Sequence, residues 1–296
     1  HRFYERLVES DVLPTTSQAS PAAFDQELRR VRDSGSAAVV LTISSKLSGT
    51  YQSACIAAAD YDNVYVVDSG TAAIGTGILA EYALTCIDRG MDAAALVREL
   101  TEKREDVCVL ALVDTLEYLK RGGRISKTTA LAGGLLNIKP VLTIEKGEIL
   151  LIGKARGSRQ GNNLLVEKIR ACGGIDFQLP ILLGYTGLTD VFLKKYVEDS
   201  RALWENGVDG LESTLIGGVF SRFLLTGTHV MASNSPPNSS AGDRGAAAKA
   251  MQIRPVYPGA CLAIWAPSML YFHGMRGECI MRNEPAPVRA LLRGGR

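Results

Sequence analysis

Residues 38–59 read AVVLTISSKLSGTYQSACIAAA, and the rest of the fold can be built outward from this stretch. Its first part, residues 38–43, is a short apolar run typical of a strand buried in a parallel sheet. Its last part, residues 51–59, is rich in alanine and predicts a helix packed against that strand. Between them, residues 44–50 hold four hydroxyl side chains, one glycine and one lysine. The pattern predicts a strand, a hydroxyl-rich loop and a helix in succession.

The loop at residues 44–50 has the chemistry of a small anion site. A loop between a strand and a helix directs free backbone N–H groups, and the positive end of the helix dipole, at whatever occupies it. The hydroxyl of Ser48 adds a donor, and Gly49 lets the backbone approach closely. The alternative is purely structural, with Ser48 as a helix N-cap and Gly49 as a turn residue.

A second hydroxyl-rich loop, LPTTSQASP, occupies residues 13–21. Ser20 followed by Pro21 predicts a helix start, and the helix is expected to run to about residue 33. Thr16 and Ser17 lie before this cap, so helix capping does not account for them.

Composition excludes several classes of protein. The net charge is +2 over 296 residues, without a run of Lys or Arg, so no nucleic-acid partner is expected. No apolar segment reaches about 18 residues and no signal peptide opens the chain, so no stable membrane insertion is expected. The six cysteines are scattered and are interpreted as mostly reduced core residues of a cytoplasmic protein. The three histidines are too dispersed for a zinc site, so neither a metal nor a cofactor is expected.

The order of the expected elements divides the chain into three parts. Alternating helices and strands predict a parallel-sheet α/β/α domain over residues 1–105. A hairpin around Lys146-Gly147, with further strands and helices, predicts a smaller α+β domain with a mixed sheet over residues 106–222. The expected strands of this domain are 107–113, 139–145, 148–154, 180–185 and 210–219, and its main helices are 162–171 and 188–206. Residues 223–296 are expected to lie outside the fold, because 231–250 has linker composition and prolines interrupt the apolar stretch 256–273.

Motifs for catalysis are missing from the sequence. No G-x-S-x-G pentapeptide occurs, and the Lys-Thr pair at residues 127–128 lacks the preceding glycine of a phosphate loop. The carboxylates of Asp68, Asp114, Glu117 and Glu145 form no spaced pair for acid–base work. We therefore expect binding, and assign no catalytic residue.

Several motifs in order resemble the DegV family of bacterial fatty-acid-binding proteins. They are LPTTSQASP, ISSKLSGTYQSA, VDS, DTLEYLKRGGRIS and LLNIKPVL followed by a glycine hairpin and KARG, between about residues 3 and 219. The resemblance implies that two domains clasp one long-chain fatty acid. It implies that Thr16 and Ser48 hold the carboxylate, with Ser17 and Gly49 beside them, and that Arg156 and His229 occupy the family's basic and histidine positions. It further implies a non-catalytic subunit that presents the carboxylate to a separate ATP-dependent fatty acid kinase.

The sequence departs from the family at both ends. The family's first strand, with its T-D-S loop, has no match ahead of His1, and residues 220–226 interrupt the motif that leads to His229.

Two alternatives remain open from the residues. A phosphotransferase-type enzyme could use the same anion site for a small metabolite. Small residues such as Gly75 and Gly77 could leave room for an acyl chain or permit close helix packing.

Overall fold

Strand β1 (Ala37–Thr42) lies at the centre of the first sheet, as the opening stretch predicts. It pairs in parallel with β2 (Val64–Asp68) on one side and with β9 (Ala260–Ala266) on the other. Strands β10 (Met269–His273) and β11 (Cys279–Met281) extend this sheet antiparallel. The structure is a computed structural model that describes residues 16–125, 137–177, 179–204 and 213–216, and the backbone of strands β8–β11.

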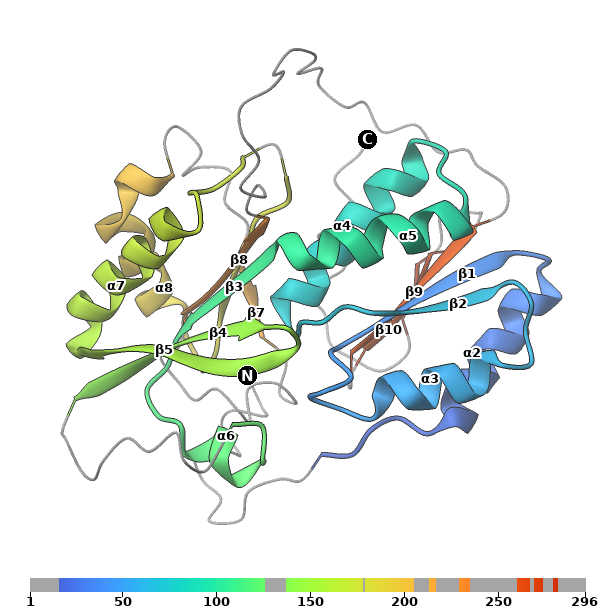
Figure 1. The fold of residues 1–296 in the computed structure, drawn as a ribbon, viewed down its shortest axis with the longest axis horizontal. Coiled ribbons are helices and arrows are strands. Elements are labelled where there is room, and N and C mark those ends of the chain that lie inside the picture. The colour runs from blue at the N-terminus through green and yellow to red at the C-terminus, as the bar shows by residue number, and fades with distance from the viewer. Residues whose placement is uncertain are drawn as a thin grey trace.

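The two faces of β1 are covered by different pairs of helices (Figure 1). Ala38 and Val40 pack with α2 (Pro21–Asp33) and α3 (Thr50–Ala58). Val39 and Leu41, which alternate with them, pack with α4 (Ile74–Asp88) and α5 (Ala93–Lys103). Burial on both faces explains why β1 is apolar throughout. The expected α/β/α arrangement around a parallel strand pair is confirmed.

The second sheet is mixed, as expected. Its order is β5–β4–β3–β8–β6–β7, and all neighbours are antiparallel except β6 and β7. Helices α7 (Gly157–Ala171) and α8 (Val191–Asp199) cover one face, while α4 packs against the other. The strands are β3 (Val107–Leu112), β4 (Ile138–Glu145), β5 (Glu148–Arg156), β6 (Leu182–Tyr185), β7 (Ser213–Leu215) and β8 (His229–Asn234). The short elements are η1 (Arg104–Asp106), α6 (Glu117–Arg121) and η2 (Arg201–Leu203).

Helix α4 contacts both sheets, and its glycines serve this packing. A Cβ on Gly75 would lie 2.3 Å from Thr71 Oγ1 and 2.6 Å from Val109 Cγ2. A Cβ on Gly77 would make an ordinary contact, 3.4 Å from Leu182 Cδ2. Close packing, rather than room for an acyl chain, therefore explains Gly75.

Helix α8 is shorter than the predicted helix over residues 188–206. It ends at Asp199, and η2 follows after Ser200. The Ser200 hydroxyl donates to the Tyr196 carbonyl (2.5 Å) and accepts from Trp204 Nε1 (3.0 Å). This local network ends the helix and turns Trp204 into the core, where its side chain is fully buried.

Strands from residues 223–296 pair in both sheets, which differs from the expectation that this segment lies outside the fold. Strand β8 lies between β3 and β6, and β9 lies beside β1. Backbone N–H and C=O groups along a central strand need partners, and these segments supply them to β1 and β3. The linker-like composition that led to this expectation belongs to residues 231–250, and most of these residues lie between β8 and β9 in the sequence. The boundary at residue 105 stays a prediction.

Candidate functional site

Buried hydroxyl side chains gather near the carboxyl ends of β1 and β2 and in the first turns of the helices that follow. The seven are Thr42, Ser44, Thr50, Ser53, Ser69, Thr71 and Thr76, each at most 3% exposed. Most of them bond to backbone carbonyls or to one another, but Thr71 Oγ1 has no hydrogen-bond partner among the described residues. The carboxyl end of a parallel sheet is where ligands bind in open α/β folds. This polar cluster is therefore the candidate site.

Asp68 holds the loops after β1 and β2 together. Its carboxylate accepts the backbone N–H of Ser45 (3.2 Å) and that of Gly70 (2.9 Å). The Ser44 N–H donates to the Thr71 carbonyl at 2.7 Å, which joins the same two loops. Asp68 therefore fixes the loop that contains Ser48.

The Ser48 hydroxyl lies in a hydrogen-bonded turn with Thr50. Its Oγ accepts the Thr50 N–H at 3.3 Å and lies 2.8 Å from Thr50 Oγ1. If Thr50 donates in that pair, Ser48 accepts twice and its own proton is available to an outside acceptor. Gly49, not Ser48, is the N-cap of α3. The expectation that Ser48 is the N-cap is therefore wrong.

Gln18 joins the loop at residues 16–20 to the loop at residues 44–50. Its Nε2 donates to Ser53 Oγ at 3.1 Å. Its Oε1 lies 1.9 Å from where a Cβ on Gly49 would stand, so any other residue at position 49 would make the Gln18 side chain move. The structure thus brings the T-S-Q loop against the loop that contains Ser48. Gln18 lay inside the quoted motif, but sequence reasoning gave it no role.

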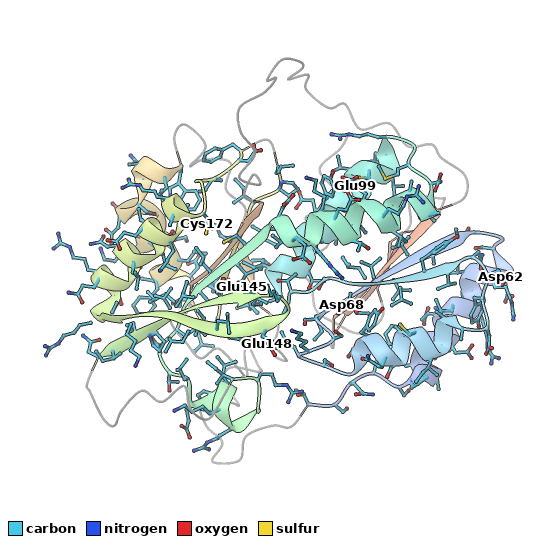
Figure 2. The ribbon with its side chains drawn as sticks, viewed as in Figure 1. Asp62, Asp68, Glu99, Glu145, Glu148 and Cys172 are labelled. Carbon is cyan, nitrogen blue, oxygen red and sulfur yellow. The ribbon has the colours of Figure 1, made fainter. Side chains whose placement is uncertain are left out.

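The second sheet also contacts the loop at residues 44–50, through the turn between β4 and β5. The Ser44 hydroxyl donates to the Gly147 carbonyl at 2.7 Å. Figure 2 shows Glu145 and Glu148, which flank this turn, near the middle of the molecule on the side facing the first sheet. Gly147 has φ +83°, and a Cβ there would stand 2.6 Å from Ser44 Oγ. Glycine is required by both the backbone conformation and the close approach.

Arg124 is the cation that reaches the loop at residues 44–50. Its Nε donates to the Leu47 carbonyl at 3.1 Å, and its Nη1 donates to the Gly122 carbonyl at 2.5 Å. Arg121, in the short helix before Arg124, pairs with Glu117 (2.6 Å) and does not reach the loop.

An apolar cluster borders the polar loop. Ile43, Leu47 and Ala72 are buried together, and Ile144 and Ile149 of the β4–β5 hairpin pack against them. The two hairpin isoleucines also contact the main core around α4. The loop at residues 44–50 therefore has polar groups and an apolar surface within a few residues of each other.

The remaining predicted site residues are less tightly placed. Thr16 is half-buried and Ser17 is exposed, in the loop that Gln18 anchors. Arg156 is exposed at the far end of β5, about 26 Å of extended strand from Glu148, so the structure does not bring it to Ser44. Its own N–H donates to Gln160 Oε1 at 2.8 Å. For His229 only the backbone is described, in register with Leu112 and Tyr185.

Tyr51 is the ionisable side chain near these loops whose pKa is clearly shifted. The pKa of Tyr51 is raised by a hydrogen bond with Cys55, by burial and by the nearby Asp68, so its phenol stays neutral at physiological pH. Arg104 lies beside this group, with Nη1 donating to the Asp68 carbonyl at 2.9 Å. The arrangement can supply neutral donors and cationic charge to an anion.

The described residues also bear on metal sites and membrane spans. Within the described residues, no three His, Cys, Asp or Glu side chains come together as ligands for a metal ion. Among the helices that the structure describes, none has the length and apolar character needed to cross a membrane.

Known proteins are similar to this chain in sequence and in fold. A fatty acid-binding protein of Thermotoga maritima is 36% identical over 172 residues, which are 57% of this chain and 60% of that protein. The chain thus spans less than two thirds of that relative. The structure of a fatty-acid-binding DegV family protein of Thermus thermophilus matches with TM-score 0.67 and 31% identity, over 79% of this chain and 84% of that one.

A further solved structure extends the similarity of the fold. The fatty acid kinase (Fak) B3 protein of Streptococcus pneumoniae, loaded with linoleic acid, matches with TM-score 0.66 over 79% of this chain and 83% of that one. Its identity is 23%, so this match concerns the fold alone. The family model described as "Uncharacterised protein, DegV family" matches residues 1–222, three quarters of the chain. By sequence and by fold, this chain belongs to the DegV family.

Proposed function

We propose that the chain binds one long-chain fatty acid, with its carboxylate at the loops 16–20 and 44–50. The observation that supports this most strongly is the contact between the two loops, where Gln18 packs on Gly49 and bonds to Ser53. This contact places the T-S-Q and L-S-G-T motifs side by side. The Thermotoga maritima relative and the Thermus thermophilus structure are each more than 30% identical to this chain, and both are named as fatty-acid-binding proteins.

The polar groups of these loops suit a carboxylate. A carboxylate removed from water is costly unless several donors surround it. Ser48 and Thr16 each supply a hydroxyl group, the Ser48 hydroxyl can donate outward when Thr50 donates to it, and the loop stands at the N-terminus of α3. Arg124, held at the Leu47 carbonyl, adds positive charge on the side of the second sheet. We propose Arg124, rather than Arg156, as the cation at this end of the ligand.

The apolar groups suit an acyl chain. The cluster of Ile43, Leu47 and Ala72 continues into Ile144 and Ile149 of the hairpin. An acyl chain that leaves the loop along this cluster would lie between the first sheet and the β4–β5 hairpin. Each methylene removed from water there contributes about 0.8 kcal/mol, so chain length sets the affinity.

Alanine substitution of the two hydroxyls tests the site. Loss of one donor to a buried carboxylate weakens binding by about 1–3 kcal/mol, or about 5- to 150-fold. We expect this loss for Thr16→Ala and for Ser48→Ala, measured by titration with a fluorescent long-chain fatty acid. Thr101→Ala is the matched control, because it removes an exposed hydroxyl that bonds only to the Val97 carbonyl on α5. Wild-type affinity in a Thr16→Ala/Ser48→Ala double variant would refute the site.

We also propose that the chain presents the carboxylate to a separate kinase instead of phosphorylating it. The support is the family resemblance together with the lack of a phosphate-loop motif or a nucleophile–base motif in the sequence. Purified chain, a long-chain fatty acid and labelled ATP should give acyl phosphate only after a fatty acid kinase from a bacterium is added. Phosphate transfer by the chain alone would instead support the phosphotransferase alternative.

A further inference from the structure

Two cysteines that are far apart in sequence meet in the second sheet. Cys108 is the second residue of β3 and Cys172 caps the end of α7, 64 positions later. Their Sγ atoms lie 3.9 Å apart. Cys172 is exposed, and Figure 2 shows it at the end of α7, on the face of the sheet that this helix covers. Cys108 is partly buried against the core under α7 and α8.

Regular elements, not loose loops, hold the two sulfur atoms near each other. Helix α7 packs on β3, β4 and β5, and the Cys172 N–H closes its last turn on the Lys168 carbonyl at 3.0 Å. Cys108 belongs to a strand paired with β8. A disulfide needs an S–S separation of about 2.05 Å, so the sulfur atoms must approach by about 2 Å. Rotation about χ1 moves a cysteine sulfur by that amount without moving the backbone.

We propose that Cys108 and Cys172 form a dithiol that hydroperoxides oxidise to a disulfide. The exposed Cys172 thiolate attacks one oxygen of the hydroperoxide, forming an S–O bond and breaking the O–O bond. Cys172 becomes a sulfenic acid, and hydroxide or alkoxide leaves. The Cys108 sulfur then attacks the Cys172 sulfur and displaces the hydroxyl group, which leaves as water with the Cys108 proton. The net change is two thiols and one hydroperoxide to one disulfide, one water and one alcohol or second water.

The local environment assigns the order of the two steps. Cys172 is the exposed thiol of the pair and Cys108 is the partly buried one, so a hydroperoxide reaches the Cys172 sulfur first. Burial, followed by the proximity of Cys172, raises the pKa of Cys108 to about 12. The proton therefore stays on Cys108 until the second step consumes it. Cys86 differs, because its thiol is buried and has no cysteine beside it among the described residues.

Peptide mapping of the full-length protein tests the proposal. Trypsin cleavage after Arg104 and Lys120 releases residues 105–120, and cleavage after Arg170 and Lys194 releases residues 171–194. Each peptide contains a single cysteine, so a link between them is unambiguous. After one equivalent of hydrogen peroxide under native conditions, we expect the two peptides to be joined, two hydrogens lighter than their sum. A reductant should separate them.

Variants separate the proposed roles. In Cys108→Ala, sulfenic acid should persist at Cys172 and react with dimedone at least about tenfold more than in the wild type, where Cys108 removes it. In Cys172→Ser, neither the link nor a dimedone adduct at Cys108 should form. Cys55→Ser, which changes a cysteine on α3, should behave like the wild type. Equal dimedone labelling of Cys172 in wild type and Cys108→Ala, or a link from Cys172 to another cysteine, would overturn the proposal.

The wild-type protein provides a test that needs no variant. The disulfide would close a loop of 64 positions between β3 and α7, which restricts the unfolded chain. The unfolding temperature of the peroxide-treated protein should rise by about 5–15 °C and return to its first value with a reductant. An unchanged unfolding temperature together with unlinked peptides would also refute the proposal.

Discussion

Gly147→Ala should weaken the contact between the hairpin tip and the loop that contains Ser48. A non-glycine residue in the left-handed region costs about 1–2 kcal/mol, and Gly147 has φ +83°. The new Cβ would also stand 2.6 Å from Ser44 Oγ and would displace the hydrogen bond that the Ser44 hydroxyl donates to the Gly147 carbonyl. That bond contributes about 1 kcal/mol. We expect a total loss of about 2–3 kcal/mol in the free energy of unfolding.

Gly35→Ala is the matched control for this substitution. Gly35 follows α2 with φ +68°, but a Cβ there would meet no atom within 4 Å. Urea unfolding should therefore show only the backbone cost for Gly35→Ala, about 1 kcal/mol less than for Gly147→Ala. Fatty-acid titration should show weaker binding by about fivefold for Gly147→Ala and no change for Gly35→Ala, because only the first disturbs the proposed site.

A double-mutant cycle isolates the contact itself. In a Ser44→Ala background the hydroxyl that the new Cβ would strike is gone, so Gly147→Ala should cost no more than Gly35→Ala does. Equal costs for Gly147→Ala and Gly35→Ala in the wild-type background would refute the argument, since they would mean that the hairpin tip does not press on the loop.

Two further predictions concern the framework of the first sheet. Gly75→Ala should destabilise the protein by about 1–3 kcal/mol because its Cβ would overlap Thr71, whereas Gly77→Ala, in ordinary contact, should be neutral or stabilising by up to about 1 kcal/mol in urea unfolding. A result in the reverse order would contradict the packing of α4. The hydrogen bond from Tyr61, followed by that from Arg29, lowers the pKa of Asp25 below its usual 3.8. Asp25 therefore contributes stability above about pH 4 that is lost as pH falls through its lower folded pKa, so Asp25→Asn should flatten the acid limb of the stability profile.

Local chemistry explains what could be predicted from the sequence. Ser20 accepts the Ala23 N–H at 3.3 Å and Pro21 begins α2, as the cap and N1 proline predict. The hairpin at Lys146-Gly147 follows from turn residues between two apolar runs, and β1 follows from its apolar run. Each of these depends on residues within a few positions of one another.

Long-range contacts explain what could not be predicted. That Gly147 meets Ser44, and that Gln18 meets Gly49, depends on packing between segments about 30 to 100 residues apart. No local pattern marks those pairs. Helix α8 ended early because Ser200 bonds to both Tyr196 and Trp204, a pairing that the amphipathic period does not reveal.

Native mass spectrometry of the purified full chain tests the central proposal most directly. After incubation with excess C16 or C18 fatty acid, the folded protein should gain the mass of one fatty acid per chain, and the Thr16→Ala/Ser48→Ala variant should gain little or none. A folded wild-type protein that takes up no fatty acid, or a double variant that takes it up equally well, would contradict the proposed binding site.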